Sequence, residues 1–180
     1  MPADFEKIMN NIDWPYVHVT INHFPIVLAS LGAGVALLAL IRGKRGLWLY
    51  TMATMTLAGL SVYPAYFTGD QADQYLNDPW YIKSGAIDAH NAAANYALAA
   101  LLVVGAFCAY GWWRALRYRE ERIPGFVRTI VFLGTMLSFA ILTRTAYLGG
   151  KIVLEAPVLT LKTAPPGLPP GIATPPEKGK

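Results

Sequence analysis

The residues with the clearest chemical potential are the three histidines, His18, His23 and His90, which all lie near the start of long apolar stretches. An ionisable side chain in such a stretch is costly in a membrane unless it faces the bundle interior or a watery cavity. Two neutral imidazoles from facing helices can serve as the axial ligands of a low-spin haem b. We therefore predict that His23 and His90 form a cofactor-binding pair.

His18 is the alternative ligand on the same stretch as His23. The two residues are five positions apart, which separates them by roughly 140° around a helix at about 100° per residue. They cannot both face one cofactor equally, so only one of them is expected to pair with His90. A structural role is the competing interpretation, because a histidine within a span often only bonds across to a neighbouring helix, worth roughly 1 kcal/mol.

Further ionisable residues lie at the same ends of the apolar stretches as the histidines. Arg144 is a candidate partner for the haem propionates. Its alternative role is to reach the membrane surface or to pair with Asp88 or Asp70. A bare metal ion needs three or four ligands, which His23, His90, Asp70 and Asp88 could supply. The same residues could accept the proton of a quinol headgroup.

Four apolar stretches must position these residues. The chain has 180 residues, of which 54% are hydrophobic and only 14% charged. Each stretch holds roughly 20 or more mostly uncharged residues, the length that a helix needs to cross a hydrocarbon core about 30 Å thick. The sequence therefore predicts an all-α integral membrane protein, a four-helix transmembrane bundle over residues 17–150. Its helices are expected at residues 17–41, 47–67, 87–113 and 126–148.

The charged residues predict the orientation of this bundle. The two links between consecutive helices are basic: they hold Arg42, Lys44, Arg45, Arg114, Arg117, Arg119 and Arg122. Because short basic loops face the cytoplasm, both termini are expected on the extracytoplasmic side of a bacterial inner membrane, in the periplasm where there is one. The net charge of +4 is then explained by topology, and we expect no nucleic-acid partner.

The bundle is flanked by two segments of different composition. Residues 1–16 are polar and acidic, run directly into the first apolar stretch and show no cleavable signal peptide. Residues 151–180 are rich in proline, which favours an extended polyproline conformation. We expect both segments to lie outside the cytoplasm and to bind other membrane-protein subunits.

The two halves of the chain are similar to one another. The second apolar stretch ends in "AYFTGD" (residues 65–70) and the fourth in "AYLGGK" (residues 146–151), and each follows a stretch that carries a histidine near its outer end, His23 or His90. This pattern predicts two copies of one helical hairpin. Copies that run in the same direction imply a pseudo-twofold axis along the membrane normal.

Four segments in order, "NHFPIVLAS", "YPAYFTGDQAD", "IDAHNAAANYAL" and "TAYLGGKIV", resemble the bacterial four-helix membrane domain known as domain of unknown function 2231. The resemblance covers about residues 17–155 and implies the same four-helix fold. Some members of that family are fused to Rieske iron–sulfur domains, which implies work near electron-transfer chains. Close relatives often read His-Glu where this chain has His90-Asn91. This departure from the family pattern removes the carboxylate and argues against a carboxylate-assisted metal site.

These observations lead to two expectations about function. The only cysteine, Cys108, lies within the third apolar stretch, and no C-x-x-C-H motif for covalent haem attachment is present. No nucleophile with its base and no phosphate-binding loop is evident, so we do not expect an enzyme acting alone. We expect an accessory or structural subunit of a larger membrane complex for electron transfer, photosynthesis or respiration. The alternative is an electron-transfer subunit that binds haem b or quinol through His23 and His90.

Overall fold

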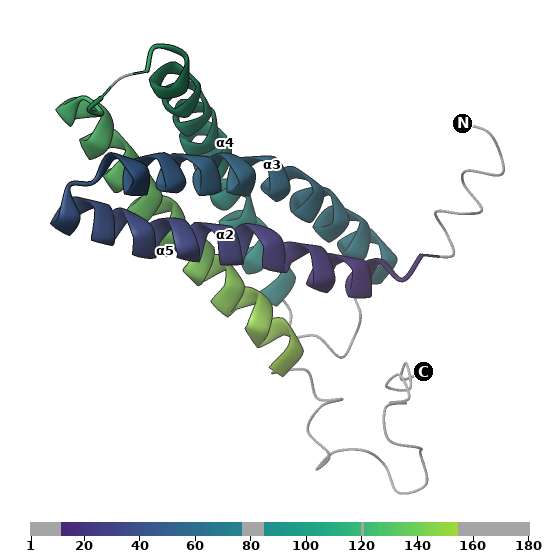
Figure 1. Ribbon diagram of the computed structural model, residues 1–180. Helices are drawn as coiled ribbons and strands as arrows, with labels where there is room; N and C mark the ends of the chain where they lie inside the picture. Colours follow the sequence, from purple (N-terminus) through teal and green to yellow (C-terminus); the bar gives the residue numbers. More distant parts are fainter. Residues whose placement is uncertain (1–11, 77–84, 120, 155–180) are drawn as a thin grey trace, which may run out of the picture.

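The structure is a computed structural model that describes residues 12–76, 85–119 and 121–154. Within these residues it contains four long α-helices, which lie lengthwise against one another as a bundle (Figure 1). They are α2 (Trp14–Arg42), α3 (Arg45–Leu76), α4 (Ala86–Arg117) and α5 (Gly125–Leu154). Each predicted stretch lies inside one helix, and each helix is longer than predicted. Most of the predicted outer segments, residues 1–16 and 151–180, lies outside the described residues.

Three of the four helices are long and apolar enough to cross a membrane: α2, α4 and the part of α5 from Gly125 to Ile152. The chain is therefore a helical membrane protein. In α3, hydroxyl and glycine residues interrupt the apolar stretch, and its last turns carry Asp70 and Asp73.

Local sequence explains where α2 begins and ends. The carboxylate of Asp13 accepts a hydrogen bond from the Tyr16 backbone N–H at 3.2 Å, which caps the helix. Pro15 occupies the first turn, where its missing N–H costs nothing. At the other end, Gly43 adopts a left-handed conformation (φ 64°), and its N–H donates to the Ala39 carbonyl at 2.9 Å. This tight turn brings α3 directly back along α2.

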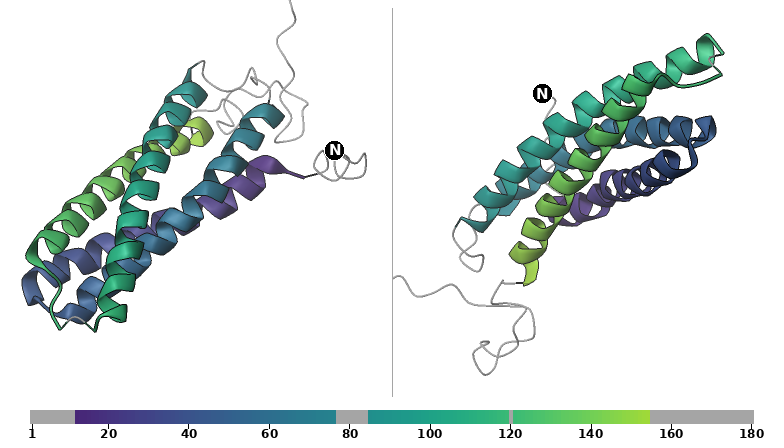
Figure 2. Two further views of the ribbon diagram at one scale, coloured as in Figure 1. Left: turned by 90° about the horizontal axis from the view of Figure 1, so that it is seen from above. Right: turned by 90° about the vertical axis from the view of Figure 1, so that its left-hand side faces the viewer.

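The helices form a closed ring in which neighbours in sequence are neighbours in space. α2 packs against α3, α3 against α4 and α4 against α5, and a less extensive contact between α2 and α5 closes the ring. Figure 2 shows the same arrangement from two further directions. α2 and α4, which carry the histidines, therefore lie on a diagonal of the bundle.

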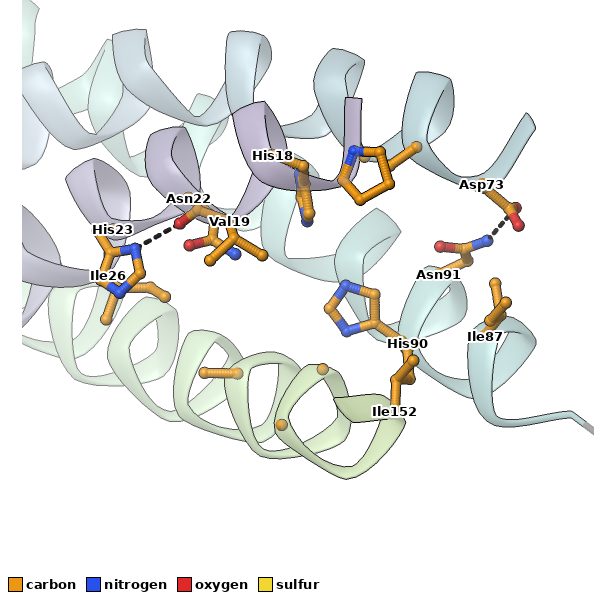
Figure 3. A pocket seen from close by; sticks show the side chains of 16 residues that line it. His18, Val19, Asn22, His23, Ile26, Asp73, Ile87, His90, Asn91 and Ile152 are labelled. Carbon is orange, nitrogen blue, oxygen red and sulfur yellow. Dashed lines mark hydrogen bonds between the residues drawn. The ribbon is translucent and has the colours of Figure 1, made fainter. Parts of the chain in front are cut away.

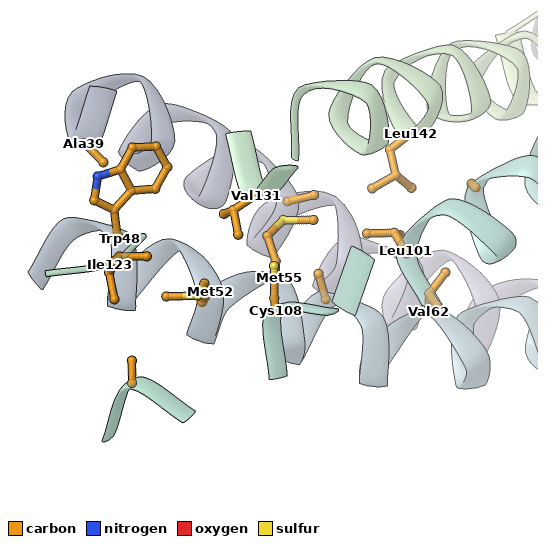
Figure 4. Close-up of a cluster of buried hydrophobic side chains, with 14 residues drawn as sticks. Ala39, Trp48, Met52, Met55, Val62, Leu101, Cys108, Ile123, Val131 and Leu142 are labelled. Atoms are coloured by element: carbon orange, nitrogen blue, oxygen red, sulfur yellow. The ribbon is translucent and has the colours of Figure 1, made fainter. Parts of the chain in front are cut away.

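The core is built from close helix contacts and a few large side chains. A Cβ atom placed on Gly59 of α3 would lie 2.8 Å from the Leu101 carbonyl oxygen and 3.1 Å from the Gly105 Cα, so α3 and α4 touch backbone to backbone. Met52, Met55 and other buried side chains fill the interior (Figure 4).

Corresponding helices of the two hairpins bury the same positions. α2 and α4 each bury four residues with the same spacing: Pro25, Ala29, Ala33 and Ala36 in α2, and Ala97, Leu101, Gly105 and Cys108 in α4. α3 and α5 share five: Thr51, Met55, Ala58, Val62 and Ala65 in α3, and Val131, Thr135, Ser138, Leu142 and Thr145 in α5. Each helix therefore presents the same face to the core as its counterpart in the other hairpin.

Candidate histidine-pair site

His18 and His90 face one another at one end of the bundle. Each lies in the second turn of its helix, His18 in α2 and His90 in α4. Their ring centroids are 6.4 Å apart, with an angle of 77° between the ring planes. Figure 3 shows the two rings pointing toward one another across a cavity. The side chains thus approach along the diagonal of the ring of helices.

Both imidazoles are anchored on a neighbouring helix in the same way. The Nδ1 of His18 lies 3.0 Å from the Ala65 carbonyl oxygen in α3, and the Nδ1 of His90 lies 3.1 Å from the Thr145 carbonyl oxygen in α5. A carbonyl oxygen can only accept, so Nδ1–H donates in both cases. In a neutral ring this leaves a lone pair on Nε2. Each half-buried histidine therefore offers a free Nε2.

A cavity of about 410 Å³ borders the two rings. This volume is in the range of roughly 300–1,000 Å³ that is usual for cofactor and ligand sites. All four helices line the cavity, with residues that include His18, Asn22, His23, Gly69, Asp73, His90, Asn91, Ala146, Gly149 and Gly150. A smaller cavity of about 70 Å³ lies deeper in the bundle and also touches both histidines; it is lined by Pro25, Val62, Ala97 and Leu142 among others. Open space therefore lies on both the outer and the inner side of the histidine pair.

Polar contacts between α3 and α4 fix one wall of the site. The Asn91 side-chain amide donates to Asp73 Oδ2 at 2.8 Å, and the Tyr66 hydroxyl donates to Asn95 Oδ1 at 2.7 Å. Asp73 is the carboxylate that lines the large cavity. The candidate ligands predicted from the sequence include neither Asp73 nor Asn91.

The structure brings His18, the alternative ligand on α2, to face His90, and it does not bring the predicted partner His23 there. His23 is exposed, and its Nδ1 donates to the Val19 carbonyl of its own helix. It lines the cavity wall without facing His90 (Figure 3). The rotation of α2 about its axis turns His18 inward and His23 away, as their roughly 140° separation around a helix requires.

The other predicted ligands are not brought together. Asp70, Asp88 and Arg144 are exposed, and none of them is among the residues that line the large cavity. Asp70 instead accepts a hydrogen bond from the Gln74 side chain of the next helical turn at 3.0 Å. Among the described residues, no group of three or more His, Cys, Asp or Glu side chains could hold a metal ion. The predicted four-ligand set, to which His23 and His90 also belong, is therefore not assembled.

No family model, no curated protein and no solved structure matches this chain. The resemblance to domain of unknown function 2231 stays a prediction from the four sequence segments.

Proposed function

We propose that this protein is a membrane electron-transfer subunit that binds one haem b between His18 and His90. The single observation that supports this function is the pair of facing imidazoles, each with its Nδ1–H donated to a backbone carbonyl and its Nε2 left free. A histidine that binds a metal almost always donates its other ring N–H to such an acceptor, which fixes the tautomer and the ring orientation. When bound, the haem supplies a one-electron redox couple.

The separation of the rings agrees with axial ligation. Two metal–nitrogen bonds of about 2.0 Å each, with about 1 Å more from each Nε2 to its ring centre, give a centroid separation of about 6 Å. The two centroids are 6.4 Å apart. The cavities on the outer and inner sides of the pair offer space for the edges of a flat macrocycle.

The number of ligands favours haem over a bare ion. Zinc takes at least three protein ligands, whereas haem iron is already bound by its macrocycle and needs only axial ligands from the protein. In the part of the chain that the structure describes, no third His, Cys, Asp or Glu side chain is close enough to share a metal ion with the two histidines. A group that brings its own equatorial ligands fits this donor set best.

The proposal includes the topology that the sequence predicts. We propose that α3 also crosses the membrane, because it runs the length of the bundle between α2 and α4. The basic links then face the cytoplasm, and both termini and the histidine pair lie at the extracytoplasmic end. The matching buried faces and the two equivalent histidine contacts support a pseudo-twofold repeat of the hairpins.

We also propose that the protein works within a larger membrane complex. The chain has three histidines, and only His18 and His90 face one another. One haem carries one electron, so the subunit requires a separate electron donor and acceptor. This requirement agrees with the expectation of a subunit and adds a role in electron transfer to it.

The first prediction tests haem binding through the three histidines. The purified full-length protein, supplied with hemin, is expected to give a low-spin reduced-minus-oxidised spectrum. His18→Ala and His90→Ala should each abolish this spectrum because each removes one axial ligand. His23→Ala is the matched control and should retain it, since His23 bonds only within its own helix. A wild-type protein without a b-type spectrum would contradict the proposal, and so would loss of the spectrum in His23→Ala alone.

A further inference from the structure

Each histidine ring lies against the backbone of the neighbouring helix at a glycine residue. A Cβ atom on Gly69 of α3 would lie 2.9 Å from His18 Cε1 and 3.2 Å from its Nδ1. A Cβ atom on Gly149 of α5 would lie 3.0 Å from His90 Cε1 and 3.2 Å from its Nδ1. Two carbon atoms in ordinary contact are about 3.5–4.0 Å apart. A side chain as small as alanine would therefore force the His18 ring to shift at Gly69, and at Gly149 it would press the His90 ring closer than ordinary contact.

A ring that moves away from such a side chain also moves relative to the carbonyl that anchors it. Gly69 follows Ala65 by four residues, and Gly149 follows Thr145 by four, so each glycine lies one helical turn beyond the carbonyl that accepts Nδ1–H. The carbonyl and the glycine together form one recess for the ring. A Cβ atom would push the ring out of this recess and away from the carbonyl.

We propose that Gly69 and Gly149 are positioning residues that hold the two imidazoles face to face. Each helical hairpin contributes an equivalent half-site of three parts: a histidine on its first helix, and a carbonyl and a glycine on its second. The inference rests on the proposed function, because the atoms that the glycines position are the two axial ligands.

The first test compares hemin binding by Gly69→Ala, Gly149→Ala and Gly34→Ala. The first two substitutions should weaken hemin affinity by about 10- to 100-fold, the usual effect of disturbing groups that orient a metal ligand. Gly34→Ala is the control, because Gly34 lies in α2 away from the cavity lining and nothing lies within 4 Å of a Cβ atom at that position. Circular dichroism of each variant establishes that the helices are retained. Wild-type affinity in both Gly69→Ala and Gly149→Ala would overturn the inference.

A second test uses the haem-free protein, so that failure of the proposed function is distinguished from failure of this inference. Nitrogen NMR of ¹⁵N-histidine reports the tautomer and hydrogen bonding of each ring. Gly69→Ala should shift the signals of His18 selectively, Gly149→Ala those of His90, and Gly34→Ala neither. If the wild type binds no hemin but these selective shifts appear, haem binding is wrong and the positioning role is supported. Unchanged signals in both variants would overturn the positioning role whether or not hemin binds.

Discussion

The two histidines of the site differ in one hydrogen bond. His18 Nδ1 lies 3.0 Å from the Ala65 carbonyl and also 3.3 Å from the Thr68 hydroxyl oxygen. The Thr68 hydroxyl donates to a backbone carbonyl of its own helix, so its oxygen can accept from His18. Leu148, one residue before Gly149, takes the place that Thr68 has before Gly69, and it offers no acceptor. His18 is therefore held by two acceptors and His90 by one.

This difference predicts a small effect for Thr68→Val, which removes the second acceptor and keeps the shape of the side chain. The hydrogen bond to Ala65 remains, so the loss in the free energy of hemin binding should match one ordinary hydrogen bond. That is about 0.5–1.5 kcal/mol, or roughly tenfold or less in hemin affinity. Hemin titration of the purified protein measures it. Leu148→Val is the control at the equivalent position and changes no hydrogen bond. Loss of binding as complete as in His18→Ala would show that Thr68 does more than assist Ala65.

At the scale of the helix, the rotation of α2 decided which histidine enters the site, and the sequence could not predict this rotation. In a water-soluble protein the polar face of a helix identifies its outer side. α2 is apolar on all sides, with Phe24 and Val27 among its exposed residues. Because both core and lipid accept such side chains, no periodicity distinguished His18 from His23.

The alignment of the two halves of the repeat, as predicted from the sequence, is likewise wrong by one residue. Matching "AYFTGD" with "AYLGGK" pairs Gly69 with Gly150, whereas the histidine contacts pair Gly69 with Gly149. The useful signal was the distance of each histidine from the start of its helix, which is the same for His18 and His90. That signal becomes available only when the helix starts are known.

The crossing of α3 and α4 gives a prediction about stability. A Cβ atom on Gly105 would lie 3.0 Å from the Gly59 Cα and 3.2 Å from the Met55 carbonyl oxygen, and neither backbone atom can move aside as a side chain can. Gly105→Ala should therefore force the helices apart and cost about 1–3 kcal/mol, as overpacking typically does. Thermal unfolding in detergent measures the loss. Gly34→Ala, where a Cβ atom meets nothing within 4 Å, is the control, and equal stability of the two variants would contradict the close crossing.

For the molecule as a whole, the sequence predicted the four helices that the described residues form, in the same order, but underestimated their lengths. Long apolar stretches joined by basic links indicate membrane helices directly. The second helix was expected to end at residue 67, yet α3 continues to Leu76. Its last turns contain Asp70 and Asp73, and hydropathy detects only the part of a helix that suits lipid. The cavity wall formed by Asp73 therefore lay beyond the predicted helix.

The orientation of the whole bundle gives the last prediction. The histidine pair and the basic links lie at opposite ends, so the positive-inside rule predicts that Asp88 faces outward and Lys44 faces the cytoplasm. Both residues are exposed, and the only native cysteine, Cys108, is buried. A membrane-impermeant maleimide should label Asp88→Cys in intact cells or spheroplasts, and Lys44→Cys only after permeabilisation. The wild-type chain, as control, should not react.

The opposite labelling pattern would show that the bundle has the inverted orientation, with the histidine pair on the cytoplasmic side. The labelling result also determines which partners the proposed haem can reach. A haem between His18 and His90 lies within two helical turns of the ends of α2 and α4, close to one membrane surface. Electron exchange is then favoured with proteins on that side, and outward labelling of Asp88→Cys would direct the search for a donor or acceptor to extracytoplasmic domains.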